Sequence, residues 1–330
     1  MAEKVFTRNF DRPNSHTLAV YRETGGYTAL PKALAMEPAA ITEEVKKSNL
    51  RGLGGAAFPT GMKWSFIPKG STDPKYLVIN ADEGEPGTFK DRYLLERDPH
   101  ALIEGMIIAA RAIDSHRGFV YIRGEYVQPW RVFSGAVKEA YEAGLLGQNI
   151  QGSGFDFDIV VHRGAGAYIC GEETGLLSSL EGKKGWPKIK PPFPAVKGAF
   201  GHPTIVNNVE TIAAVPHIIN RGGAWFAGLG TKTQGGTRLY SVSGHVVKPG
   251  VVEAPVSVTL RSLIYDHCGG IRPGHRLKAV VPGGGSAPIL TADEIDVTMD
   301  ADGLKAARTM IGSPGGIVMG ETVSLPEALA

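Results

Sequence analysis

The sequence is poor in cysteine, with only Cys170 and Cys268 among 330 residues. Two thiols cannot build the disulfide framework of a small secreted protein, and they fall short of the four thiolates that an iron–sulfur cluster normally needs. A chain of this length buries a core of its own without such cross-links. The cysteine count therefore indicates a reducing compartment, and no metal-ligand set stands out.

An excess of one charge and long apolar runs are also missing. The chain has 35 Lys+Arg against 33 Asp+Glu, a formal net charge of +2, and no block of like charges that would neutralise nucleic-acid phosphates. No apolar stretch approaches the roughly 18 residues of a spanning helix, and Met1–Phe10 carries charge where a signal peptide would be apolar. We expect a cytoplasmic protein with no membrane insertion and no nucleic-acid partner.

Glycine, in contrast, is abundant. It accounts for 44 of the 330 residues, and proline for 22. Average proteins contain roughly 7% glycine, so this backbone must turn tightly or approach something closely at many points.

Apolar runs and amphipathic segments alternate through the first half of the chain. The sequence predicts helices over Pro38–Asn49, Pro99–Ile113 (with Asp98 as N-cap) and Pro129–Ala143, and strands over Tyr76–Asn80, Gly118–Arg123 and Phe155–Val161. The order β-α-β-α-β predicts an α/β fold with a mostly parallel sheet. Ligands bind outside the carboxyl ends of such strands, which here are the loops beginning at Asn80 and His162.

The pattern changes near residue 235. Lys183–Pro203 is too rich in Pro, Gly and Lys for regular structure, and a helix capped by Asn208 runs toward Asn220 with Pro216 as an interruption. Beyond Gly235, short β-like runs surround one helical segment; the runs are Leu239–Val242, Val251–Glu253 and Lys278–Val281, and the helix is Leu260–His267. We predict a first domain over residues 1–235 and a small α+β domain over 236–330.

A glycine loop lies at Gly52–Gly61. Its first residues satisfy G-x-G-x-x-G/A, but a helical segment precedes it and Pro59 follows, whereas the dinucleotide fingerprint needs a strand before and a helix after. We interpret the loop as backbone laid against a planar or phosphorylated ligand, with N–H groups as donors. A purely structural turn is the alternative.

Two acidic loops follow strand ends. Asp82, Glu83 and Glu85 lie within four positions, and a small-residue loop starting at Gly164 ends on Glu172 and Glu173. Hydroxyls of a ribityl or ribose chain would satisfy the acceptors of the first loop. A divalent metal and a solvated turn are alternatives for the first loop. Two such loops at successive strand ends suggest one shared ligand.

Hydrolase chemistry has little support. No H-E-x-x-H or G-x-S-x-G motif occurs, and Cys170 has no adjacent His as base. The basic stretch from Lys183 to Lys197, with Trp186 and Phe193, suits an anionic phosphate and a stacked base, or is a solvated loop.

Five motifs together resemble a known family. They are GLGGAAFPTGMKW (Gly52–Trp64), NADEGEPGTFKDR (Asn80–Arg92), YICGEET (Tyr168–Thr174), KPPFPA (Lys190–Ala195) and NNVET (Asn207–Thr211). In this order they are similar to the flavin- and NADH-binding component of respiratory complex I, the F-subunit family of NADH-quinone oxidoreductase, and to diaphorase subunits of NAD-linked hydrogenases and formate dehydrogenases. The resemblance covers roughly residues 40–325, and it implies a Rossmann-like FMN-binding domain followed by a β-grasp (SLBB, ubiquitin-like) domain.

The resemblance also implies site residues. FMN would contact Gly52, Gly55, Lys63, Asn80, Asp82, Glu83, Tyr168, Gly171, Glu172, Asn207, Asn208 and Thr211. NADH would contact Phe58, Phe66, Glu85, Glu173, Lys190 and Phe193. Hydride would pass from NADH to FMN, and electrons would continue to iron–sulfur centres and to quinone or another redox partner. No residue needs to act as acid or base, and Glu85 is the nearest candidate.

Departures from the family pattern leave alternatives open. Leu53 stands where the family usually has Arg, and Ala57 where it usually has Gly. The cysteine ligands of the family's [4Fe–4S] cluster are absent from this sequence. We expect a multi-subunit complex with an iron–sulfur partner, peripheral to the inner (plasma) membrane. A non-catalytic paralogue or assembly subunit and a stand-alone diaphorase with a different acceptor are the alternatives.

Overall fold

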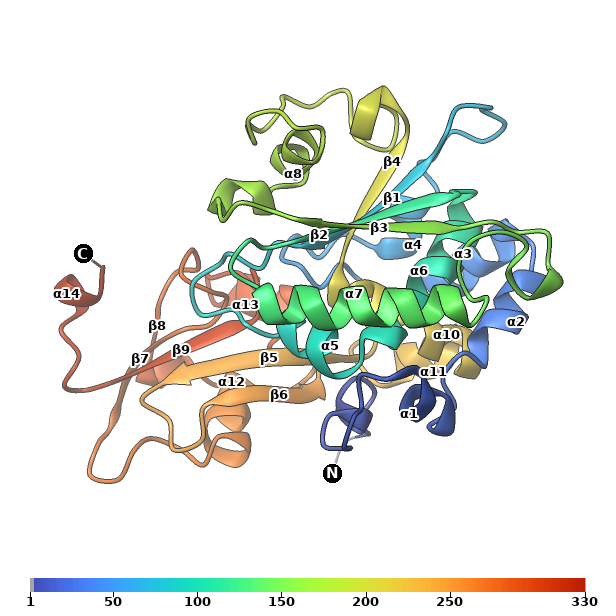
Figure 1. Ribbon diagram of the computed structural model, residues 1–330. Coiled ribbons are helices and arrows are strands. Elements are labelled where there is room, and N and C mark those ends of the chain that lie inside the picture. The colour runs from blue at the N-terminus through green and yellow to red at the C-terminus, as the bar shows by residue number, and fades with distance from the viewer. Residues whose placement is uncertain (1–2, 330) are drawn as a thin grey trace.

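A computed structural model describes residues 3–329 (Figure 1). The first sheet has four strands in the order β3-β2-β1-β4, and every neighbouring pair is parallel. The strands are β1 (Tyr76–Ala81), β2 (Arg117–Ile122), β3 (Asp158–Arg163) and β4 (Thr204–Asn208). The predicted α/β class with a parallel sheet is confirmed.

Both faces of this sheet are covered, which explains the continuous apolar run of β1. Leu77 and Ile79 enter the large core, whereas Val78 enters a smaller cluster on the opposite face; all three side chains are buried. Helices α5 (Asp91–Arg97), α6 (Pro99–Ile113) and α7 (Val127–Glu142) cover the large-core face, and α8 (Glu173–Leu180) covers the other (Figure 1).

The remaining helices surround α6 or continue the chain toward the second sheet. They are α1 (Leu18–Glu23), α2 (Ala29–Ala35), α3 (Pro38–Lys47), α4 (Thr60–Trp64), α9 (Val209–Ala213), α10 (Val215–Arg221) and α11 (Gly223–Gly228). Short 3-10 turns lie at Thr7–Asn9, Ile150–Gly152, Tyr168–Gly171, Ala199–Gly201 and Ala292–Glu294. The Asn208 side chain accepts from the Glu210 N–H, and the helix is interrupted at Ala214 beside Pro216, as predicted.

Two local details differ from the sequence prediction. The Asp98 side chain does not cap α6; it accepts a hydrogen bond from the Asn9 side chain at 3.0 Å instead. Strand β3 begins at Asp158 rather than Phe155, because the Phe157 backbone pairs with Gly147 before the strand joins the sheet.

The second sheet has the order β6-β5-β9-β7-β8. Its strands are β5 (Thr237–Gly244), β6 (Gly250–Pro255), β7 (Leu277–Val281), β8 (Leu290–Thr291) and β9 (Gly315–Gly320), and its helices are α12 (Leu260–Ser262), continued by a π-helical turn over Leu263–His267, α13 (Ala301–Ala306) and α14 (Leu325–Leu329). Strand β9 pairs parallel with β5 and antiparallel with β7, and the sequence prediction missed it.

The glycine loop lies where the two halves of the chain meet. The Leu53 side chain is buried in the large core of the first sheet, and the Ala57 methyl is buried in the core of the second. Ala57 has φ +50°, a left-handed conformation that favours glycine. Within residues 3–329 we find no helix with the length and apolar character needed to cross a membrane.

Candidate functional site

The loops that follow β1 and β3 meet at one edge of the sheet. The Asn80 side chain donates to the Gly171 carbonyl at 2.8 Å, and the Tyr168 hydroxyl donates to the Glu85 carboxylate. Gly171 approaches so closely that a Cβ there would lie 3.3 Å from the Asp82 carbonyl oxygen. The expectation that the two strand-end loops converge is confirmed.

The glycine loop joins this edge from the connection between α3 and α4. The Gly52 N–H donates to the Phe58 carbonyl at 2.8 Å, which closes the loop. Gly54 packs so tightly that a Cβ would lie 2.8 Å from the Asn208 Cβ. Gly54 itself is exposed, and its N–H meets no acceptor among residues 3–329. This free donor fits the oxygen atoms of an anionic or polyhydroxylated ligand.

Asp82 provides the complementary acceptor. Its side chain is only 8% exposed, and its buried Oδ2 has no hydrogen-bond partner within the described chain. Burial raises the pKa of Asp82 to about 6, against the opposing charge of Arg123. Asp82 and Arg123 line a small cavity of about 90 Å³ together with Gly84, Glu125, Gly166, Ala167 and Tyr168. An orphaned buried acceptor of this kind fits a ligand hydroxyl or N–H.

Glu83, the next residue, points into the fold. Its carboxylate accepts the Lys90 and Asp91 N–H groups at 2.8 and 3.0 Å and the Tyr126 hydroxyl at 2.9 Å. Burial raises the pKa of Glu83 to about 7, and the nearby Asp91 charge adds to this shift. The carboxylate therefore holds the start of α5 against the acidic loop, and a direct ligand contact for Glu83 stays a prediction.

Asn207, Asn208 and Thr211 brace the glycine loop and its surroundings from the protein side. The Trp64 indole donates to the Asn207 side chain at 2.9 Å, and the Asn208 amide donates to Asp91 at 2.6 Å. The Thr211 hydroxyl accepts the Leu53 N–H at 2.8 Å. The predicted contacts of these three side chains with FMN stay predictions, because each already has a protein partner.

Exposed aromatic rings and an ion-pair cluster lie near the same loops in the sequence. The Phe58 and Phe66 rings pack with centroids 5.9 Å apart, whereas Phe193 is 59% exposed and pairs with no other ring of the described residues. Lys190 lies 2.5 Å from Glu173 and 3.3 Å from Glu172.

Lys63 reaches the same cluster, at 3.1 Å from Glu173. Burial alone would raise the pKa of Glu173, but Lys63 and Lys190 hold it below its usual value. Glu172 also caps α8, because its side chain accepts the Thr174 and Gly175 N–H groups at 2.8 and 2.9 Å. Sequence motifs separated by more than 100 residues thus meet in one charged cluster.

Glu85 is held from two directions. Besides the Tyr168 hydroxyl, it accepts the Ser286 N–H at 2.7 Å from the second half of the chain. Burial would raise the pKa of Glu85, but these hydrogen bonds lower it overall. A carboxylate that is ionised and accepts two hydrogen bonds can orient a ligand, but it has no proton to donate. Sequence reasoning missed Ser286 and Arg123; only the position of Arg123 at the end of a predicted strand signalled the latter.

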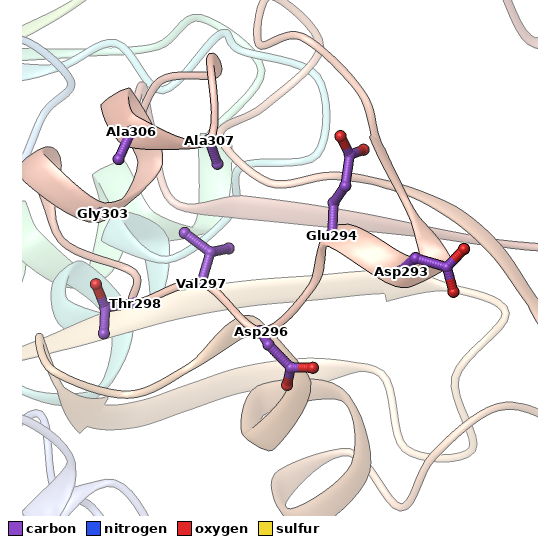
Figure 2. Close-up of a pocket in the computed structure, with 8 residues that line it drawn as sticks. All are labelled: Asp293, Glu294, Asp296, Val297, Thr298, Gly303, Ala306 and Ala307. Atoms are coloured by element: carbon purple, nitrogen blue, oxygen red, sulfur yellow. The ribbon is translucent and has the colours of Figure 1, made fainter.

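A larger cavity of about 490 Å³ lies elsewhere, beside α13 (Figure 2). Its carboxylates point in different directions, and two have local roles: Asp296 pairs with Arg261 at 2.5 Å, and Glu294 accepts the Thr291 N–H at 2.8 Å. No group of three or more metal-ligating side chains occurs anywhere in residues 3–329, and Cys170 and Cys268 are both buried.

A parallel sheet with ligand loops at its carboxyl edge, followed by a small β-rich unit, defines a Rossmann-like α/β protein with an appended β-grasp unit. Residues 45–217 match the Nuo51 FMN-binding domain family, and residues 238–319 match the SLBB domain family. The chain belongs to the F-subunit family of NADH-quinone oxidoreductase.

Individual relatives support this membership. The chain is 56% identical to NADH-quinone oxidoreductase F-subunit 2 of Rhizobium meliloti (strain 1021), over 98% of this chain and 77% of that protein. It is 54% identical to the NADH-quinone oxidoreductase F-subunit of Mycobacterium bovis (strain ATCC BAA-935 / AF2122/97), over 98% and 74%. A crystal structure of an NAD+-reducing [NiFe]-hydrogenase in the H2-reduced state is similar with a TM-score of 0.83 and 35% identity; the match covers 99% of this chain and about half, 52%, of that one.

Proposed function

We propose that the protein is the FMN-binding, NADH-oxidising subunit of a larger electron-transfer complex. Family membership supports this, and one observation carries it. An unpaired backbone donor at Gly54 and an unpaired buried acceptor at Asp82 belong to loops that converge at one edge of the sheet. Those are the two kinds of group that a flavin mononucleotide, with phosphate, ribityl hydroxyls and ring N–H, would satisfy.

FMN, when bound, accepts a hydride from the nicotinamide of NADH. The protein's part is to bind and orient. Gly52, Gly54 and Gly55 would let the backbone approach the flavin, and Asp82 would accept from it, with Asn80, Gly171 and Tyr168 fixing the facing loop. Glu83, Asn207, Asn208 and Thr211 would keep the loops in place.

NADH would bind across the outer side of the same loops. Phe58, Phe66 and Phe193 offer exposed rings for stacking the adenine. Lys190, paired with Glu173, would receive the polar parts of the nucleotide, whereas Lys63 and Glu172 of the same charged cluster would face FMN. Glu85 would orient the nicotinamide end without exchanging a proton, since its hydrogen bonds favour the ionised form.

Onward electron transfer would need a partner. We propose that the electrons pass from the flavin to an iron–sulfur subunit of the complex and then to quinone or a different acceptor. We further propose a division at residue 235, between an FMN- and NADH-binding domain and an SLBB-like domain. The location would be cytoplasmic, in a complex peripheral to the inner membrane.

Leu53 does not favour the non-catalytic alternative. Its side chain is buried in the large core, so at this position the backbone rather than the side chain borders the candidate crevice. The substitution therefore leaves the Gly54 donor accessible.

The test is reconstitution. Purified chain incubated with FMN and desalted is expected to be yellow, and to reduce ferricyanide with NADH. Protein that stays colourless, or that holds FMN but fails to oxidise NADH, would remove the enzymatic assignment and favour an assembly role.

A further inference from the structure

Arg238 lies in an unusual position at the start of β5. Its side chain is completely buried, which is rare for a guanidinium because removal from water is costly. It forms no ion pair within 4 Å in the described chain. Its hydrogen bonds both go to backbone carbonyls, that of Leu53 at 3.2 Å and that of Gly312 at 3.5 Å.

Buried charges nearby offset part of the cost of burying this cation. Glu210 is fully buried, and its carboxylate accepts the Leu239 N–H at 2.6 Å. Lys90 bridges Glu210 at 2.7 Å and Asp91 at 2.6 Å. The two carboxylates act on Arg238 through their charge, whereas its hydrogen bonds are directed to the glycine loop and to Gly312.

The contact with Leu53 has a geometric consequence. The Leu53 carbonyl and the Gly54 N–H belong to the same planar trans peptide, in which they point in opposite directions. A guanidinium that holds the carbonyl inward therefore turns the Gly54 N–H outward. On the other side of the residue, the Leu53 N–H is fixed by the Thr211 hydroxyl at 2.8 Å.

We infer that Arg238 is a positioning residue for FMN, which clamps the Leu53–Gly54 peptide so that the Gly54 N–H faces the ligand. This rests on the proposed function. It gives the second half of the chain a part in flavin binding: its first strand fixes the orientation of a donor that belongs to the first half.

The experiment compares full-length variants after removal of flavin. FMN affinity is measured by quenching of flavin fluorescence, and stability by thermal unfolding without FMN. Arg238→Met is expected to weaken FMN binding at least tenfold. Arg238→Lys keeps the positive charge and an N–H donor group, so it is expected to recover most of both affinity and stability. Leu239→Ala is the matched control: it removes a buried side chain of the same strand and should lower stability while changing FMN affinity less than twofold.

Thr211→Val provides an independent check if Arg238→Met fails to fold. It removes the hydrogen bond on the Leu53 N–H, which belongs to the preceding peptide, and should also weaken FMN binding. Wild-type affinity in Arg238→Met and Thr211→Val, or an equal loss of affinity in Leu239→Ala, would overturn the positioning role. Failure of the wild-type chain to bind FMN would instead refute the proposed function, so the two failures are distinguishable.

Discussion

Asp82 is predicted to destabilise the protein in the absence of ligand. Its pKa is raised from 3.8 to about 6 because the carboxylate is buried with Oδ2 unpaired. The difference of about 2 between these pKa values corresponds to about 3 kcal/mol at neutral pH, as an order of magnitude. Asp82→Asn removes the charge at nearly constant size, so the flavin-free variant is expected to be more stable than wild type by up to about 3 kcal/mol at pH 7.

The pH dependence fixes the sign of this prediction. Because the folded pKa is raised, the penalty is fully present above about pH 6 and disappears as the pH falls toward 3.8. Urea unfolding should therefore show the advantage of Asp82→Asn shrinking to about half at pH 5. The same variant should bind FMN more weakly. An advantage that is absent at about pH 7, or unchanged at about pH 4, would show that the buried charge is not what destabilises the apoprotein.

Three other predictions concern the stability of the fold and the binding of NADH. Glu83→Ala, in contrast to Asp82→Asn, should destabilise the apoprotein by about 3 kcal/mol in urea unfolding, since it leaves the buried donors of α5 and Tyr126 unpaired; unchanged stability would contradict the capping role. Phe193→Ala should raise the KM for NADH by the equivalent of roughly 1–3 kcal/mol with FMN retained, and loss of flavin would assign the ring to the other ligand. Burial, with the charges of Arg8 and Arg221, lowers the pKa of His217 to about 3. The unfolded chain then takes up a proton that the folded protein excludes, so there is no penalty above about pH 6.5 and the penalty grows on acidification: between about pH 7 and pH 5 wild type should lose about 2 kcal/mol more than His217→Gln, and parallel losses would disprove it.

The first sheet was predictable because a strand that is buried on both faces has a continuous apolar run in its sequence. The apolar run of β1 and the amphipathic repeat of α6 each reflect one local surface, and short connections fix their order. Strand β9 has no such apolar pattern, since half of its residues are glycine. The reason is tertiary: a Cβ on Gly315 would lie 2.4 Å from the Gly87 carbonyl oxygen, so the strand needs glycine to approach the acidic loop.

The directions of individual site side chains were harder to predict from the sequence than the positions of strands. Asp82 and Glu83 are adjacent, chemically similar and both buried, yet one lacks a partner and the other has several. Beyond the end of β1 the side chains no longer alternate between two faces. The direction in which each one points therefore depends on which distant groups can bond to it. For Glu83 these are the donors at the start of α5, and for Arg238 they are carbonyls that lie 74 and 185 positions away in the sequence.

The proposed function depends on the glycine loop and the two acidic loops forming a single flavin site. An experimental structure of the protein with FMN added would examine this at the level of individual atoms. We expect flavin bound between these loops, with an FMN atom accepting from the Gly54 N–H and Asp82 accepting from FMN. Flavin bound elsewhere, such as beside α13, or loops with both groups satisfied by the protein alone, would show that no such site exists.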